Sequence, residues 1–207
     1  MKVIVLSAMH GRHQVVSYCL DKIPITDVVM VFTTREDKIF LRSKNILKSV
    51  YARNEPLSYK WETGLSALKN IDFDVVILLG SDDYIDEKFI NYVVDNIKGY
   101  DMLCFKDIYF ENNGKMYYWS GYENERKGEP IGAGKAYTKE FLRRINFSLF
   151  KVAKNKSLDG LSWRICKNAK AKILLSSVKE NDLMLCDVKT WGGITSFNKI
   201  KHLLNKL

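Results

Sequence analysis

The sequence predicts an α/β protein in which helices cover a mainly parallel, Rossmann-like central sheet. The first observation is the mainly apolar, branched run at residues 73–79, which is typical of a central strand buried on both faces. The second is a similar run at residues 3–6, followed by an amphipathic helix and another apolar strand at 27–33. The third is the length of 207 residues, which suits one domain with a full core.

Strands and helices alternate along the first half of the chain. The first strand, its helix and the strand at 27–33 form a right-handed βαβ unit. Beyond it we expect a helix over 37–50, a short edge strand at 51–54, a helix opening at Pro56, and a helix running from Asp86 to Ile97 after the central strand.

The second half predicts a hairpin and further α/β elements. Asn112-Asn113-Gly114 is a strong turn sequence between two strand-like stretches. The elements expected here are a strand over 101–110, its partner over 116–120, a helix carrying Phe141, Leu142 and Ile145, a helix over 160–166, a strand over 172–176, and a basic amphipathic helix over 197–207. The last helix can pack on the sheet, or touch a membrane surface or a partner.

Composition limits the classes of function. The net charge of +9 suggests anionic partners such as nucleotide diphosphates, anionic lipids or nucleic acid, and an ordinary solvated basic surface explains it equally well. The four cysteines have no CxxC spacing, so no zinc site is indicated. Free thiols, with no segment long enough for a signal peptide or a membrane span, lead us to expect a cytoplasmic protein. Neither GxGxxG nor GxxxxGK[ST] occurs, so the sequence supports neither a dinucleotide-binding fold nor a P-loop.

Asp82 and Asp83 follow the central strand directly. In open α/β sheets, ligands bind at the carboxyl ends of the strands. Two adjacent carboxylates repel each other unless a cation lies between them, and hard oxygen ligands select Mg²⁺ or Mn²⁺, which is usually shared with substrate phosphates. The alternative is an acidic turn that opens the next helix. The uninterrupted apolar strand before the pair favours a site.

The stretch Gly80-Ser81-Asp82-Asp83-Tyr84 resembles the metal-binding DxD region of GT-A glycosyltransferases, in particular those of family 2. Many members carry an acidic residue where this chain has Gly80, so Asp82 and Asp83 must hold the metal without it. The resemblance implies a single GT-A domain over 1–207, with a nucleotide-sugar-binding half at 1–100 and an acceptor-binding half at 101–207. It also implies Mn²⁺ or Mg²⁺ as the cofactor.

The resemblance assigns further residues by position. In family 2 the ends of the first two strands hold the nucleoside, and a lysine and a glycine in the helix after Pro56 lie beside the donor. Residues 183–193 resemble a C-terminal segment that folds over the donor diphosphate. The implied donor-binding residues are Ala8, Met9, Arg12, Thr34, Glu36, Lys60, Gly64, Ser81, Asp82 and Lys189, and the implied metal ligands are Asp82, Asp83 and Asp187. Two alternatives remain: Lys60 as a solvated helix lysine, and Gly64 as a close-packing residue.

Asp159 is the candidate general base. The stretch Ser157-Leu158-Asp159-Gly160 resembles the acidic motif of family 2, in which Leu158 replaces the first acid. An inverting transfer needs one carboxylate near the acceptor hydroxyl to take its proton. The alternative for Asp159 is a helix N-cap. Residues 130–137 resemble the loop that closes over the sugar, and the aromatic residues of the hairpin are either an acceptor platform or ordinary sheet residues.

Taken together, these features predict a metal-dependent glycosyltransferase that moves a sugar from a nucleotide diphosphate sugar, with a UDP-sugar expected, to a glycan or other hydroxyl acceptor. Family 2 membership would imply inversion. A sugar-1-phosphate nucleotidyltransferase is one alternative, although residues 7–12 lack its Gly-rich, Arg-containing loop. A basic nucleic-acid-binding module is another, but the charge is scattered and no nucleic-acid motif occurs, so we expect no nucleic acid partner. A catalytically inactive relative is a further alternative because of Gly80.

Overall fold

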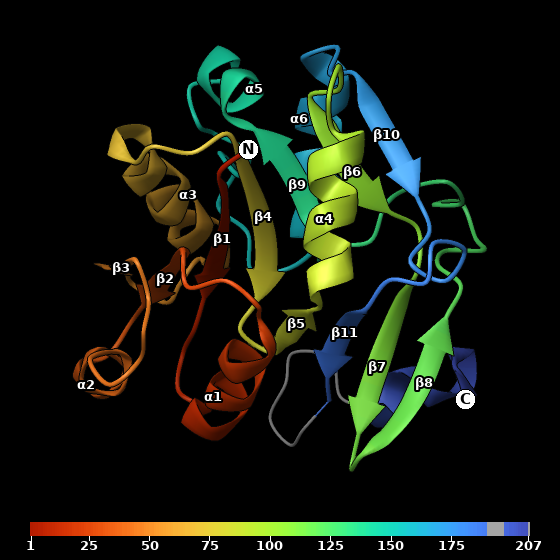
Figure 1. The fold of residues 1–207 in the computed structure, drawn as a ribbon, viewed down its shortest axis with the longest axis horizontal. Coiled ribbons are helices and arrows are strands. Elements are labelled where there is room, and N and C mark those ends of the chain that lie inside the picture. The colour runs from red at the N-terminus through yellow and green to blue at the C-terminus, as the bar shows by residue number, and fades with distance from the viewer. Residues whose placement is uncertain (190–196, 207) are drawn as a thin grey trace.

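The computed structural model describes residues 1–189 and 197–206 as a layered α/β fold (Figure 1). Its strands are β1 (Val3–Ala8), β2 (Val28–Phe32), β3 (Lys48–Tyr51), β4 (Val75–Gly80), β5 (Asp83–Ile85), β6 (Met102–Phe105), β7 (Ile108–Asn112), β8 (Lys115–Trp119), β9 (Lys135–Thr138), β10 (Ile173–Ser176), β11 (Leu185–Val188) and β12 (Asn205–Lys206). Its helices are α1 (His13–Lys22), α2 (Arg35–Leu41), α3 (Leu57–Ala67), α4 (Glu87–Asn96), α5 (Lys139–Arg144), α6 (Leu158–Asn168) and α7 (Phe197–Ile200), with 3₁₀ turns at Leu68–Asn70 and Lys201–Leu203.

The central sheet confirms the predicted fold class. Its strand order is β10-β6-β9-β4-β1-β2-β3, and every pairing is parallel except those of β9 with β4 and β6. β1 and β4 lie side by side at its centre, and their register pairs Ala8 with Gly80. The loop after β1 therefore starts beside the acidic pair that follows β4.

Helices cover both faces of this sheet (Figure 1). Apolar side chains of α1 and α4 pack on one face, and those of α3, α5 and α6 pack on the other. A second sheet, with the order β12-β8-β7-β11-β5, contains the predicted β7–β8 hairpin and extends the core of the first face. Each of the two sheets contains strands that precede residue 100 and strands that follow it.

Two element predictions in the middle of the chain are wrong. The helix expected over 37–50 ends at Leu41, and residues 48–51 instead form β3, which pairs in parallel with β2. Sheet pairing at this edge overrides the helix-favouring lysines and arginines, and it also displaces the edge strand expected at 51–54.

The strand expected over 101–110 is two strands in different sheets, β6 and β7. The break falls at Asp107, which is fully buried. Its carboxylate accepts hydrogen bonds from Tyr118 Oη at 2.9 Å, from Ser177 Oγ at 2.6 Å and from the Val178 backbone N–H at 2.8 Å. These bonds fix the corner at which the chain leaves one sheet for the other, because a buried carboxylate must be satisfied.

The basic helix expected over 197–207 is also wrong. α7 covers only Phe197–Ile200, a 3₁₀ turn follows, and β12 then pairs with the free edge of β8. The backbone hydrogen bonds offered by that edge account for the shorter helix. Among the described residues, no helix is long and apolar enough to cross a membrane.

Candidate metal and donor site

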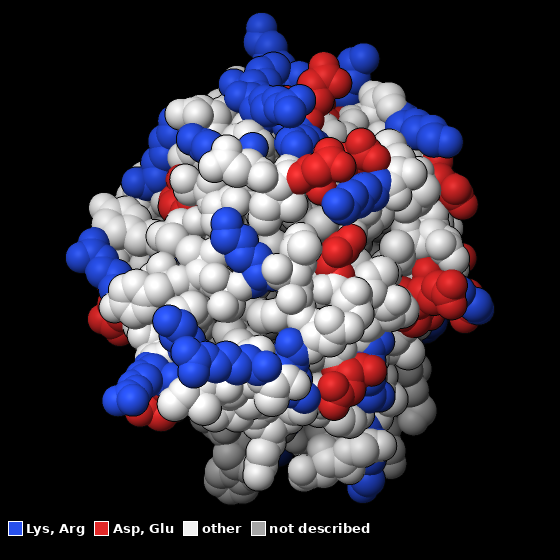
Figure 2. Space-filling view, turned by 60° about the vertical axis from the view of Figure 1, so that its left-hand side comes forward, with Lys and Arg blue, Asp and Glu red and all other residues white. Residues whose placement is uncertain are grey.

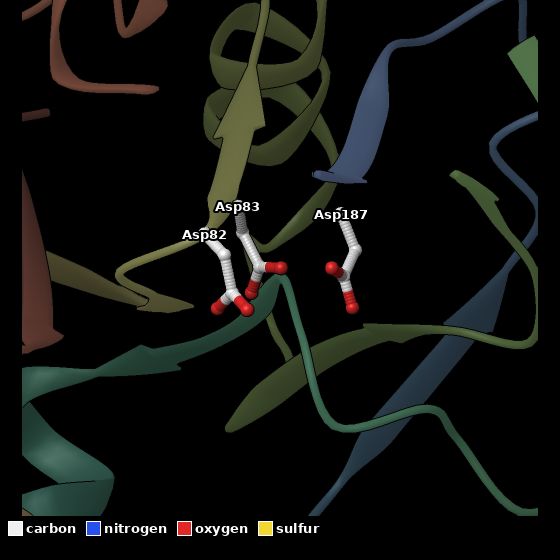
Figure 3. A group of neighbouring side chains, drawn as sticks. All are labelled: Asp82, Asp83 and Asp187. Carbon is white, nitrogen blue, oxygen red and sulfur yellow. The ribbon is translucent and has the colours of Figure 1, made fainter. Parts of the chain in front are cut away.

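Three aspartates converge at the carboxyl end of β4. Asp82, Asp83 and Asp187 each offer one carboxylate oxygen, and these oxygens lie within 4.8 Å of one another. Figure 3 shows the carboxylates of Asp82 and Asp83 beside each other, with that of Asp187 facing them from β11. We call these three residues the aspartate triad.

The second sheet brings the distant third aspartate to the pair. Asp83 is the first residue of the short strand β5, which pairs with β11 so that Asp187 lies opposite Asp83. The backbone N–H of Val188 also donates to the Asp82 carbonyl at 2.7 Å. Asp83 is 5% exposed, so the triad stands partly in the core, where an uncompensated charge is costly.

Burial and mutual repulsion disfavour ionisation of this cluster. Burial, and then the charges of Asp187 and Asp82, raise the pKa of Asp83 well above its ordinary value. Burial and the charge of Asp82 raise the pKa of Asp187 to about 7. A cation bound between these carboxylates would remove their mutual repulsion and favour the ionised forms.

The donor set fits a divalent cation. Asp187 Oδ1 is buried and has no hydrogen-bond partner among the described residues. Buried acceptors normally have a partner, so this oxygen retains lone pairs for a ligand. Asp187 Oδ2 accepts from Lys189 Nζ at 2.5 Å, and Asp82 Oδ2 accepts from Arg12 Nη1 at 2.9 Å. Carboxylate oxygens of this kind suit Mg²⁺ or Mn²⁺, and the flanking cations suit phosphate groups.

Gly80 makes room for the triad. A Cβ at residue 80 would lie 2.9 Å from Asp82 Oδ1 and 2.9 Å from Asp83 Oδ2, and the Gly80 backbone N–H donates to Asp83 Oδ2 at 2.6 Å. The departure from the DxD pattern is therefore compatible with a metal site, because any side chain at this position would push on both ligands.

Replacing Gly80 with alanine is expected to weaken Mn²⁺ binding by about tenfold or more, because the two carboxylates must move to accept the new methyl group. Isothermal titration calorimetry with MnCl₂ measures the effect. Gly160→Ala is the matched control, since the nearest atom to its new methyl group lies at 4.0 Å. Equal Mn²⁺ affinity of Gly80→Ala and the wild type would contradict a binding site at the triad.

Asp37, which the sequence analysis did not select, orders the loop that carries Arg12. Its carboxylate is fully buried and accepts from the backbone N–H of Gly11 at 2.9 Å, while His13 Nε2 lies 2.9 Å from its Oδ1. Burial opposes ionisation, but these bonds outweigh it and lower the pKa of Asp37. With Thr34, Asp37 forms a capping box at the start of α2. That Thr-x-x-acid spacing was the available sequence signal.

The predicted donor residues occupy different environments. Ala8 ends β1, Thr34 caps α2 through a hydrogen bond from the Asp37 N–H, and Glu36 is exposed in the first turn of α2. Ser81 is 6% exposed, and its Oγ lies 3.4 Å from Arg12 Nη2. Asp82 is itself a member of the triad, and Arg12, Ser81 and Lys189 lie around it. Ala8, Thr34 and Glu36 lie at the ends of the first two strands.

Three other predicted donor residues face the interior. The Met9 side chain is fully buried in the core, so it is unavailable to a ligand. A Cβ on Gly64 would lie 2.8 Å from Val31 and 2.9 Å from Leu6. The geometry therefore supports the interpretation of Gly64 as a residue that lets α3 pack closely on the sheet. Lys60 is 2% exposed and its ammonium group donates to the Met9 carbonyl oxygen. The alternative interpretation of Lys60 as a solvated lysine on the helix surface is therefore wrong. Burial lowers the pKa of Lys60 to about 8.

Two cavities meet at the triad. The larger, of about 530 Å³, is lined by all three aspartates and continues along the second sheet. The smaller, of about 290 Å³, is lined by Asp83 and Asp159. Asp83, Gly132 and Ala133 line both cavities, so the two cavities adjoin at these residues.

Asp159 lies in the first turn of α6, but it is not the N-cap, which is Ser157. Its Oδ2 accepts from Tyr122 Oη at 2.9 Å and from Arg126 Nη2 at 2.5 Å. Burial opposes ionisation, but these bonds outweigh it and lower the pKa of Asp159. The side chain is thus an ionised carboxylate facing the smaller cavity. Tyr122, Arg126 and the buried Lys135, which donates to the Asp159 carbonyl at 2.9 Å, were not selected from the sequence.

Comparison with solved structures identifies the fold. The N-terminal 1–349 fragment of TarS from S. aureus, in complex with UDP-GlcNAc, superposes with a TM-score of 0.61 at 18% sequence identity, over 93% of this chain and 60% of that one. GalNAc-T7 with UDP, GalNAc and Mn²⁺ superposes with a TM-score of 0.59 at 12% identity, over 93% of this chain and 45% of that one. The chain has a GT-A fold.

The GT-A fold is shared with proteins of a second activity. A CMP-2-keto-3-deoxy-manno-octonic acid synthetase complexed with CTP superposes with a TM-score of 0.55 at 12% identity, over 98% of this chain and 96% of that one. No protein-family model matches the sequence, and no curated protein matches it. The chain spans about 60% of the length of the TarS fragment. At the level of the fold, the GT-A domain is similar to nucleotide-sugar transferases and to nucleotidyltransferases.

Proposed function

We propose that this GT-A domain is a divalent-metal-dependent glycosyltransferase that uses a nucleotide diphosphate sugar, in the first instance a UDP-sugar, and transfers the sugar to an acceptor hydroxyl. The observation that carries the proposal is the aspartate triad, in which Asp187 Oδ1 has no hydrogen-bond partner within the part of the chain that the structure describes. Similarity to structures complexed with UDP-GlcNAc, and with UDP and Mn²⁺, supports the choice of donor and cofactor.

Each residue has a role in this proposal. Asp82, Asp83 and Asp187 would hold Mn²⁺ or Mg²⁺, which when bound supplies positive charge to the departing diphosphate. Arg12 and Lys189 lie beside the triad and add fixed positive charge for the same phosphates. Asp159, which lines the smaller cavity together with Asp83, accepts the proton of the acceptor hydroxyl. Direct displacement between these two positions inverts the anomeric centre.

A thermal-shift screen of nucleotides and nucleotide sugars, with and without MnCl₂, tests the proposal. UDP-sugars are expected to raise the melting temperature only when Mn²⁺ is present, since the ion links the triad to the diphosphate. The absence of a Mn²⁺-dependent shift with every nucleotide sugar would overturn the proposal.

The nucleotidyltransferase alternative is kept because of the similarity to the CTP-bound synthetase. It predicts stabilisation by nucleoside triphosphates and release of pyrophosphate when a sugar phosphate is added. For the nucleic-acid alternative, Figure 2 shows one face on which lysine and arginine side chains are interspersed with carboxylates and uncharged surface. A continuous basic stripe, the usual electrostatic footprint of nucleic-acid binding, is not seen on this face.

Mn²⁺ binding is expected to strengthen as the pH rises through about 7. The pKa of Asp187 in the folded, metal-free protein is raised from 3.8 to about 7. The contribution of the Asp187 carboxyl group to folding stability is therefore fully present below pH 3.8 and is lost as the pH rises through about 7. A cation must displace the same proton. Melting temperatures with and without MnCl₂ between pH 5 and 8 should therefore diverge with pH. A metal-induced shift that does not change over this range would contradict the assignment of Asp187.

A further inference from the structure

The two carboxylate oxygens of Asp159 have different surroundings. Oδ2 accepts hydrogen bonds from Tyr122 Oη at 2.9 Å and from Arg126 Nη2 at 2.5 Å. None of the hydrogen bonds between the described residues reaches Oδ1, and the side chain is 17% exposed in the wall of the smaller cavity. Because both oxygens of an ionised carboxylate are acceptors, Oδ1 is the one that remains for a ligand.

The guanidinium group of Arg126 is itself held in place. Its Cζ lies 3.8 Å from the centroid of the Tyr122 ring, and its Nε donates to Glu129 Oε2 at 2.7 Å. A planar guanidinium group that is fixed in this way loses little freedom for each hydrogen bond it makes. All three residues belong to the connection between β8 and β9, so this connection anchors one oxygen of the candidate base.

The backbone of Asp159 is fixed as well. Its carbonyl oxygen accepts from Lys135 Nζ at 2.9 Å and from Ser162 Oγ at 3.0 Å, and Lys135 is 2% exposed. With the carbonyl oxygen and Oδ2 both bonded to neighbouring groups, the carboxylate has little freedom to rotate. The direction in which Oδ1 points is therefore set before any ligand binds.

The same contacts keep Asp159 ionised. Burial alone would raise the pKa of Asp159, but the hydrogen bonds from Arg126 and Tyr122, together with the charges of Arg126 and Lys135, lower it. The other charged groups nearby are one that bonds to Arg126 and two that line the smaller cavity: Glu129, Asp83 and Lys156. A carboxyl group must be ionised before it can accept a proton, so the guanidinium group favours the form that acts as a base.

We propose that Arg126 is a positioning residue for the transfer reaction, and that by holding Oδ2 of Asp159 it leaves Oδ1 as the atom that accepts the proton of the acceptor hydroxyl. This inference rests on the proposed function, because it takes Asp159 as the general base. It assigns a role to a residue of the β8–β9 connection that neither the fold nor its neighbours assign.

The step balances with the groups already named. The acceptor proton passes to Oδ1, and the acceptor oxygen uses its own electron pair to form the bond to the anomeric carbon. The bond between that carbon and the diphosphate oxygen breaks, and its electron pair leaves with the diphosphate. Protonated at Oδ1, Asp159 still offers Oδ2 as an acceptor, so the hydrogen bonds from Arg126 and Tyr122 persist through the step.

Arg126→Gln removes both the charge and the planar fork of donors. We expect kcat for UDP release to fall by about ten- to hundredfold, because a small misplacement of a reacting group has an effect of this size, while the donor KM stays within about twofold. The assay uses the full chain, MnCl₂, water as the acceptor and the UDP-sugar that raises the melting temperature most. In the metal-free protein, a ¹³C NMR titration of the Asp159 carboxyl group, assigned with Asp159→Asn, should show its pKa raised in the variant, since the guanidinium group lowers it.

Two further arginine variants separate positioning from a structural ion pair. Arg144→Gln is the matched control, because Arg144 pairs with Asp101 at 2.8 Å and lines neither cavity at the triad. It should change neither kcat nor the titration of Asp159. Arg126→Lys keeps the charge but not the fork, so it should largely restore the pKa of Asp159 and only part of kcat. If Arg126→Gln left either kcat or the pKa of Asp159 at the wild-type value, the inference would be overturned.

Donor binding by the same samples separates this inference from the proposed function. Stabilisation by UDP and Mn²⁺, together with an Arg126→Gln variant that behaves like Arg144→Gln, would overturn only the role of Arg126. No stabilisation of the wild type by UDP and Mn²⁺ would instead remove the proposed function, and with it the reaction in which Arg126 takes part.

Discussion

Asp159→Asn is expected to lower turnover by about 10²- to 10⁴-fold, the usual contribution of a general base, while donor affinity stays within about twofold. Asparagine keeps the shape of the side chain but cannot accept the acceptor proton. Donor binding should survive, because Asp159 is not one of the triad carboxylates and its side-chain hydrogen bonds come from Tyr122 and Arg126.

Initial rates of UDP release and calorimetric donor affinities, measured on the same preparations, check this expectation. Asp72→Asn serves as the control, since the Asp72 side chain is 92% exposed and lines neither cavity. If Asp159→Asn turned over at the wild-type rate, the base would have to be another residue.

Asp82→Ala is expected to abolish Mn²⁺-dependent donor binding and to reduce transfer by about 10³-fold or more. A bound metal ion contributes several kcal/mol to stabilising charge on a leaving group, and each 1.4 kcal/mol is a factor of ten in rate. The variant also releases the guanidinium group of Arg12 from its 2.9 Å ion pair. The fold should remain, because Asp82 follows β4 in a turn and its side chain is 21% exposed.

Thermal shifts with UDP and MnCl₂, together with circular dichroism of the variant, measure the two parts of this expectation. Asp82→Asn is a useful companion, because it removes the charge while retaining an oxygen ligand, and it should retain part of the Mn²⁺ affinity. A fully active Asp82→Ala enzyme would remove the assignment of this residue.

The sequence predicted the central sheet well, because its strands are buried on both faces. The runs at residues 3–6 and 73–79 are typical of a covered strand, and the two strands lie side by side at the centre of the sheet. The second sheet could not be predicted in the same way. β5 has only 3 residues, and its pairing with β11 joins segments about 100 residues apart, so no local periodicity signals it.

Some residues of the candidate site also follow from a local sequence pattern, whereas others depend on tertiary structure. Asp82 and Asp83 follow from a local pattern, and Asp187 was selected only through the family resemblance, since its place opposite Asp83 depends on tertiary pairing. Met9 was assigned to the donor by position, but its side chain is fully buried in the core. Lys135, whose pKa burial lowers to about 8, was not selected from the sequence. Its function in holding the Asp159 carbonyl depends on the packing of β9 against α6.

A crystal structure of the protein soaked with MnCl₂ and UDP, measured with anomalous scattering, tests the central claim most directly. The account predicts an anomalous peak about 2 Å from oxygens of Asp82, Asp83 and Asp187, with the UDP diphosphate completing the coordination beside Arg12 and Lys189. A nucleotide bound with no peak at the triad, or with these carboxylates turned away from the diphosphate, would contradict it.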